Sequence, residues 1–93
     1  MLAVKRRVLF LPGREREGAA LLHSTECFRR DVGQHAQVLL RGTTDPHEYQ
    51  WVQMWVSWEA YDNWRRSIPR HELMSRLGRY MTFEPTQHYD VLE

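Results

Sequence analysis

The chain has 93 residues, of which 27% are charged and 42% are hydrophobic, and its net charge at pH 7 is +1. That length corresponds to a single domain, residues 1–93. A near-neutral balance, with acidic residues among the basic ones, argues against nucleic acid or an anionic membrane as a partner. The one cysteine, Cys27, excludes an intrachain disulfide, and no apolar run approaches the roughly 20 residues that span a bilayer. We therefore expect a cytoplasmic protein.

The first part of the chain predicts a strand, a helix and a second strand. Residues 2–12 alternate as a strand that ends at Pro12-Gly13, and a second strand is predicted at about residues 36–44. Between them, a helix is predicted from about residue 14 to residue 32, with Cys27 near its inner face as a small buried residue. The expected inner stripe consists of Glu17, Leu21, Ser24 or Thr25, Phe28 and Val32.

A third predicted strand, from Tyr49 to about Ser57, is the most informative segment because all four tryptophans lie in or just after it. Tyr49, Trp51, Gln53 and Trp55 share one face, and Gln50, Val52, Met54 and Val56 share the other. A strand with little charge on either face needs cover on both sides, and so short a chain has few helices. We therefore expect a homodimer, in which a second copy covers the aliphatic face. The aromatic face is the candidate ligand pocket.

The rest of the chain predicts two helices and a strand. Ser57 is a suitable N-cap for a helix from Trp58 to about Arg66, and Ile68-Pro69 interrupts the helical pattern. A further helix is expected at about residues 70–80 and a last strand at about residues 82–92. The order β-α-β-β-α-β, with a broken second helix, predicts an α+β, ferredoxin-like fold with an antiparallel sheet.

Several of these features occur together in a known family. They are Pro12-Gly13, the junction Trp55-Val56-Ser57-Trp58-Glu59-Ala60-Tyr61, Trp64 with Ser67, and Tyr89-Asp90-Val91 in the last strand. With them the chain resembles, over nearly its whole length, the antibiotic biosynthesis monooxygenase family of dimeric α/β barrels. The junction pattern is typical of the superfamily and not of one activity, because the fold hosts oxygenases, heme degraders, cyclases and proteins of no known activity.

The resemblance implies a cofactor-independent monooxygenase that uses molecular oxygen on an aromatic, quinol-like or polyketide-like molecule. Such an enzyme needs a slot for a flat ring, a hydrogen-bond donor at the oxyanion, and a base. The family's pocket tryptophan and tyrosine match Trp55 and Tyr61, whereas Trp51 stands where the family has an asparagine, whose function Gln53 would take over. The remaining residues expected to bind substrate, or to supply charge or take a proton, are Trp51, Trp64, Arg6, Arg41 and His71.

Two alternatives stay open. A non-catalytic ligand-binding or regulatory protein is consistent with the missing asparagine, and plain core packing would equally explain Trp51 and Trp55. A heme-degrading enzyme ranks third, because the family's histidine position falls on Met74 and the nearest histidine, His71, suits a surface position. The other histidines, His23, His35, His47 and His88, show no metal-ligand spacing, and we expect no metal.

Overall fold

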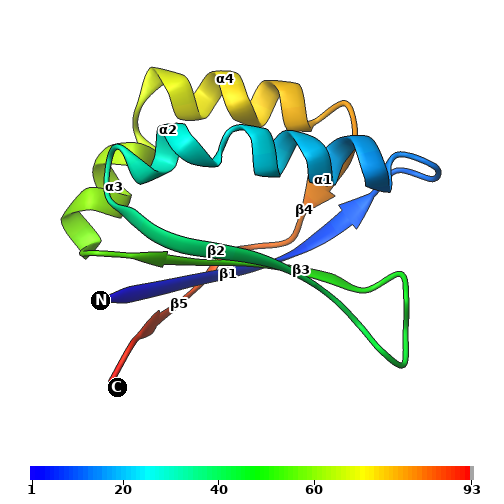
Figure 1. The fold of residues 1–93 in the computed structure, drawn as a ribbon, viewed down its shortest axis with the longest axis horizontal. Coiled ribbons are helices and arrows are strands. Elements are labelled where there is room, and N and C mark those ends of the chain that lie inside the picture. The colour runs from blue at the N-terminus through cyan, green and yellow to red at the C-terminus, as the bar shows by residue number, and fades with distance from the viewer. Residues whose placement is uncertain (93) are drawn as a thin grey trace.

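A computed structural model describes residues 1–92, in which four helices cover one face of an antiparallel sheet (Figure 1). The elements are β1 (Leu2–Phe10), α1 (Glu15–Ser24), α2 (Glu26–Arg30), β2 (Gln34–Arg41), β3 (Tyr49–Trp55), α3 (Trp58–Arg65), α4 (Ile68–Leu77), β4 (Met81–Phe83) and β5 (Gln87–Asp90). The strand order is β2-β3-β1-β4, and β5 also pairs with β1. The predicted α+β, ferredoxin-like fold with a broken second helix is confirmed.

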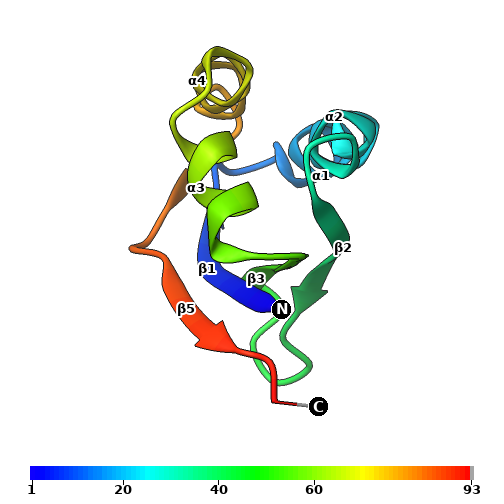
Figure 2. The ribbon, with the colours of Figure 1, turned by 90° about the vertical axis from the view of Figure 1, so that its left-hand side faces the viewer.

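The closing strand is split into two pieces, where the sequence predicted one strand over residues 82–92. Strand β4 pairs with Val8–Phe10, and β5 pairs with the other end of β1, Leu2–Lys5. Pro85 lies between the two pieces and has no N–H to donate to a neighbouring strand. Figure 2 shows β5 running beside β1, away from the helices.

The first helical segment is also divided in two: α1 ends at Ser24, and α2 begins at Glu26. Its buried positions are Gly18, Leu22, Thr25 and Arg29. The predicted stripe is confirmed at Thr25 and wrong at Glu17, Phe28 and Val32, which are exposed; Phe28 is 59% exposed, and its neighbour Arg29 is buried instead. The prediction followed the apolar residues, whereas the chain buries an arginine. Cys27 is exposed, so its expected burial is wrong for the same reason.

Gly18 lets α1 approach the sheet closely. A Cβ atom at this position would lie 2.7 Å from side-chain atoms of both Phe10 and Met81. Such contacts are too short for real atoms, so the packing of α1 on β1 and β4 depends on the missing side chain.

The second helical segment consists of α3 and α4, and each of these helices begins at a serine N-cap. Ser57 Oγ accepts a hydrogen bond from the Ala60 N–H at 3.1 Å, as predicted. Ser67 Oγ accepts one from the Arg70 N–H at 3.3 Å, so α4 begins at Ile68 and not at Arg70. Pro69 therefore lies in the first turn of α4, where the lack of a backbone N–H costs no hydrogen bond.

The core lies between the sheet and the helices. Its buried apolar side chains are Leu2, Val4, Val8, Leu22, Trp51, Trp55, Tyr61, Trp64, Leu73, Leu77 and Met81. On β3, Trp51, Gln53 and Trp55 are buried, and Gln50, Val52 and Met54 between them are half-buried, as the alternation predicted. No other part of residues 1–92 forms a layer over the opposite face (Figure 1), and no helix in that range is long and apolar enough to cross a bilayer.

Replacing the N-cap, Ser57→Ala, is expected to lower the free energy of unfolding by about 1 kcal/mol, because the Ala60 N–H loses its acceptor. Urea denaturation measures this change. Ser75→Ala is the matched control, since Ser75 is exposed inside α4, where alanine is the better helix former. Equal effects at the two positions would contradict the capping role.

Candidate functional site

A small cavity lies between the sheet and the helices α3 and α4. Its volume is about 20 Å³, which holds about one water molecule. The apolar lining residues are Val4, Trp51, Trp64, Leu73 and Met74. The polar ones are Arg6, Gln53, Tyr61, Arg65, Arg70 and Thr86, and the lining holds no aspartate or glutamate among residues 1–92.

Gln53 has a fixed orientation at the centre of the sheet. Its Oε1 accepts hydrogen bonds from Trp55 Nε1 at 3.1 Å and from Gln34 Nε2 at 3.0 Å. An indole N–H can only donate, so the atom facing Trp55 must be the amide oxygen. The Gln53 NH₂ group is left without a partner in the described chain, and Gln53 lines the cavity. The cavity therefore has an unengaged neutral donor.

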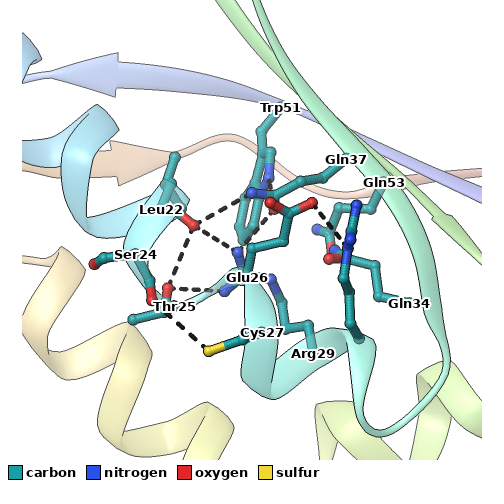
Figure 3. Close-up of polar contacts among 11 residues, drawn as sticks. Leu22, Ser24, Thr25, Glu26, Cys27, Arg29, Gln34, Gln37, Trp51 and Gln53 are labelled. Atoms are coloured by element: carbon teal, nitrogen blue, oxygen red, sulfur yellow. Dashed lines mark hydrogen bonds and ion pairs between the residues drawn. The ribbon is translucent and has the colours of Figure 1, made fainter.

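A second glutamine is oriented in the same way next to this one (Figure 3). Gln37 Oε1 accepts from Trp51 Nε1 at 3.0 Å and from Arg29 Nη2 at 2.8 Å, and Gln37 Nε2 donates to the Leu22 carbonyl at 3.2 Å. All polar atoms of the Gln37 side chain are used. The indole of Trp51 is thus tied to the helix side of the core, and the position that would hold an asparagine in the resembled family offers no free donor.

Arg29 is a fully buried cation. Its guanidinium donates to Thr25 Oγ1, to the Leu22 carbonyl and to Gln37, and it lies 5.3 Å from the centre of the Trp51 ring. Its Nε has no partner, and no carboxylate within residues 1–92 pairs with it. Burial lowers the pKa of Arg29 to about 10.

The lowered pKa of Arg29 determines the pH range in which burying its charge reduces the stability of the fold. Below about pH 10 the guanidinium is charged in both the folded and the unfolded chain, so the penalty is present throughout the neutral range. Above about pH 10 the folded chain begins to release this proton while the unfolded chain still keeps it, so the contribution of Arg29 to stability rises with pH. At pH 7 the charge is a cost that the hydrogen bonds offset.

Tyr61 brings a titratable neighbour that sequence patterns did not single out. Its hydroxyl lies 3.5 Å from Nε2 of His88, and the two rings are 5.4 Å apart. His88 comes from β5, opposite Val4 in the sheet, and also packs on Trp58. Tyr61 is buried, whereas His88 is exposed, so the pair connects the cavity with solvent.

Two arginines, Arg6 and Arg70, line the cavity, and no carboxylate of residues 1–92 lies within ion-pair distance of either. Arg6 donates through Nε and Nη2 to the Glu84 carbonyl, at 3.3 Å and 3.2 Å, and its guanidinium lies 4.5 Å from the centre of the Phe83 ring. Burial and then the charge of Arg70 lower the pKa of Arg6, while Tyr61 raises it. The polar wall of the cavity is therefore cationic.

Trp64 separates this cavity from a larger space outside. Two outer cavities of about 330 Å³ and 340 Å³ lie between α2 and the α3–α4 pair, and both are lined by Phe28, Trp64 and Pro69. Trp64 also stacks on Trp55, with ring centres 6.3 Å apart. Leu73 also lines both the inner cavity and one of the outer ones.

The structure brings together five of the eight predicted site residues at the cavity: Arg6, Trp51, Gln53, Tyr61 and Trp64. Trp55 is 0% exposed and lies beneath them as the partner of Gln53. Arg41 and His71 are exposed and do not line the cavity, because Arg41 ends β2 opposite Tyr49 and His71 points away from the sheet side of α4.

Sequence reasoning missed Arg70, Thr86 and His88 as neighbours of the site. Arg70 was visible only as one of several clustered basic residues. The contacts of Thr86 and His88 arise from the break at Pro85, which directs β5 back along β1.

The site does not fit heme. His71, the only histidine near the family's ligand position, is exposed and outside the cavity lining, and the lining itself contains no histidine of the described chain. Within residues 1–92 no group of three or more histidine, cysteine, aspartate or glutamate side chains is placed to hold a metal ion.

Comparisons with known proteins extend the resemblance to solved structures. No family model matches the sequence, and no curated protein sequence matches it. SnoaB from Streptomyces nogalater, a cofactor-independent oxygenase, superposes with a TM-score of 0.83 at 16% identity, over 99% of this chain and 93% of that chain. A Bordetella bronchiseptica protein named as an antibiotic biosynthesis monooxygenase gives a TM-score of 0.82 at 23% identity, over 99% and 97%.

A third solved structure, Rv0793 from Mycobacterium tuberculosis, gives a TM-score of 0.77 at 21% identity, over 99% of this chain and 95% of that chain. At these identities the comparisons confirm the fold that the resemblance implied, that of the antibiotic biosynthesis monooxygenases. The activity has to be argued from the site.

The buried charge of Arg29 leads to an unusual stability prediction. Arg29→Met is expected to change the free energy of unfolding by less than about 1 kcal/mol, because Gln37 Oε1 and the Leu22 carbonyl each keep a second donor. Gln37→Leu is expected to cost about 2–3 kcal/mol, because it leaves the buried Trp51 N–H without an acceptor and removes one of the three acceptors of Arg29. Urea denaturation of both variants checks this order, and a larger loss in Arg29→Met would contradict it.

Proposed function

We propose that this chain, which shares the fold of the antibiotic biosynthesis monooxygenases, is itself a small cofactor-independent monooxygenase of that family. Its substrate would be an aromatic, quinol-like or polyketide-like molecule. The observation that carries the proposal is the Gln53 amide, whose oxygen is held by Trp55 and Gln34 and whose NH₂ group is left free at a tryptophan-lined cavity. This arrangement is a prepositioned donor for an oxyanion.

The proposed reaction is balanced without a cofactor. A base removes a proton from the substrate carbon, and the resulting carbanion, delocalised onto a ring oxygen, gives its electrons to O₂. A C–O bond forms, protonation gives a hydroperoxide, and loss of water leaves a carbonyl group. Carbon is oxidised by O₂, which contributes one oxygen atom to the product and one to water.

The residues would have distinct roles in these steps. The Gln53 NH₂ group would stabilise the oxyanion, and the Trp51 and Trp64 rings would hold the flat substrate. Tyr61 would exchange the proton with solvent through His88, because its hydroxyl lies 3.5 Å from His88 Nε2 and His88 is exposed. Trp55 would act through Gln53, as a residue that holds the amide in its orientation.

A substrate ring requires more space than the cavity now offers. The side chain of Trp64 separates about 20 Å³ inside from about 330 Å³ outside, so we propose that substrate enters when Trp64 swings outward. The apparent affinity is then reduced by the fraction of molecules in the open state.

A non-catalytic ligand-binding protein of the same fold is the second candidate. The observation that favours it is Trp51, which stands in place of the family's asparagine and whose N–H is already bonded to Gln37. Such a protein would bind the ring and show no oxygen uptake above the uncatalysed rate.

We also propose that the chain forms a homodimer through the face of the sheet that the helices leave uncovered. Val38 is 47% exposed there and lies opposite Val52, and Leu40, Met54 and Tyr89 share the face. These apolar side chains lie together on β2, β3 and β5, beside Lys5 and Arg7 of β1 on the same face, and exposed apolar patches next to polar residues are typical of protein interfaces. A second copy would give the sheet the cover that β3 needs on that side.

Gln53→Glu tests the proposed oxyanion donor. The carboxylate keeps an acceptor for Trp55 and Gln34 but replaces the free NH₂ group by a negative oxygen, so oxygen uptake with a quinol panel should fall about 100-fold or more. Ser75→Glu, which adds the same charge at an exposed position of α4 outside the cavity lining, is the control and should keep the wild-type rate. An unchanged rate in Gln53→Glu would contradict the role. Ring binding by the wild type without oxygen uptake would favour the second candidate.

Val38→Lys tests the dimer. Sedimentation of the wild type at micromolar concentration should give a dimer, and the variant should give a monomer because a lysine charge would be buried in the interface. Ile68→Lys is the control, since Ile68 is 72% exposed on the helix side. A monomeric wild type, or a dimer in both variants, would rule out this interface.

A further inference from the structure

We infer that the ligand of this site carries a carboxylate, which Arg6 and Arg70 bind together. The inference rests on the proposed function for the aromatic character of the ligand. It concerns a different group of the ligand from the oxyanion at Gln53. The oxyanion would form only during the reaction, whereas the carboxylate is a permanent negative charge.

The first observation is the composition of the cavity wall. The arginines come from separate elements, Arg6 from β1 and Arg70 from the first turn of α4, and both line the same cavity. The remaining polar lining consists of the Gln53 amide, the Tyr61 and Thr86 hydroxyl groups and Arg65, and Arg65 is already paired with Asp62. A wall of donors and cations, without a carboxylate, is complementary to an anion.

The second observation is that the two charges are uncompensated. Among residues 1–92 no carboxylate lies within ion-pair distance of Arg6 or Arg70. Most other arginines of the chain are exposed or ion-paired, as Arg7, Arg14, Arg30, Arg65 and Arg66 show. Arg6 is instead half-buried, and its only hydrogen-bond acceptor is the neutral Glu84 carbonyl. Two partly buried like charges repel each other, and a bound anion removes that repulsion.

The third observation concerns geometry. The Glu84 carbonyl and the Phe83 ring hold the Arg6 guanidinium in place from two sides, through Nε, Nη2 and the ring face. This leaves Nη1 without a partner in the described chain. A planar guanidinium that is fixed beforehand binds a carboxylate with little loss of side-chain entropy. Arg70 makes no side-chain hydrogen bond within residues 1–92, so it is available as the second donor.

The floor beneath the arginines is apolar. Val4, Leu73, Met74 and the two tryptophans Trp51 and Trp64 complete the lining. The ligand class that matches both parts is an aromatic or polyketide-like carboxylic acid, with its ring against the tryptophans and its carboxylate at the arginines.

The test is a binding experiment that needs no turnover. Isothermal titration under anaerobic conditions compares 1-hydroxy-2-naphthoate with its methyl ester, which has the same ring and no charge. The wild type should bind the acid at least about tenfold more tightly than the ester. Arg6→Met and Arg70→Met should each remove most of that preference and leave the affinity for the ester unchanged.

Arg16→Met is the matched control, because Arg16 is exposed on α1 and should not alter either affinity. Arg70→Met keeps the test informative if Arg6→Met fails to fold, since Arg70 makes no side-chain hydrogen bond in the described chain. Equal binding of acid and ester, binding of neither, or parallel losses of both in the arginine variants would overturn the inference. A charge preference without oxygen uptake would support it and remove only the proposed catalytic function.

Discussion

The site depends on one constraint: two buried indole N–H groups must each find an acceptor. An indole N–H cannot accept, and a buried donor without a partner costs about 1–3 kcal/mol. Gln37 and Gln53 supply the two oxygens, at 3.0 Å and 3.1 Å. Each amide is thereby forced to turn its NH₂ group away from the indole. For Gln37 that group meets the Leu22 carbonyl, and for Gln53 it is left at the cavity. The polarity of the cavity thus follows from how the tryptophans pack.

The sequence was sufficient for the fold and for the choice of sheet face, because period-two alternation is strong in β3. It predicted that Trp51, Gln53 and Trp55 face the helices, and it identified Ser57 as a cap, since both inferences use only neighbours in the chain. It was wrong about part of the inner stripe of the first helical segment, at Glu17, Phe28 and Val32. A buried arginine breaks the apolar pattern, and its partners Thr25, Leu22 and Gln37 come partly from another element.

The parts of the site that were not predicted all depend on contacts between distant segments. The meeting of Arg6 with Arg70 joins the first strand to the fourth helix, and that of Tyr61 with His88 requires the break at Pro85. No spacing rule connects such pairs. The openness of the cavity could not be predicted either, because it depends on how four tryptophans share the space, and only one of them, Trp64, separates inside from outside.

The split closing strand has a consequence for the dynamics of the protein. Strand β5 has only four residues, all of them exposed, and it pairs with β1 alone. A short edge element whose contact with the core is made by His88 on Tyr61 opens locally at a small fraction of the free energy needed to unfold the whole chain. Each such opening carries His88 away from Tyr61, and the helices and the central strands remain intact. The chain is therefore divided into a rigid part, which holds the buried tryptophans and glutamines of the site, and a labile edge, which holds His88.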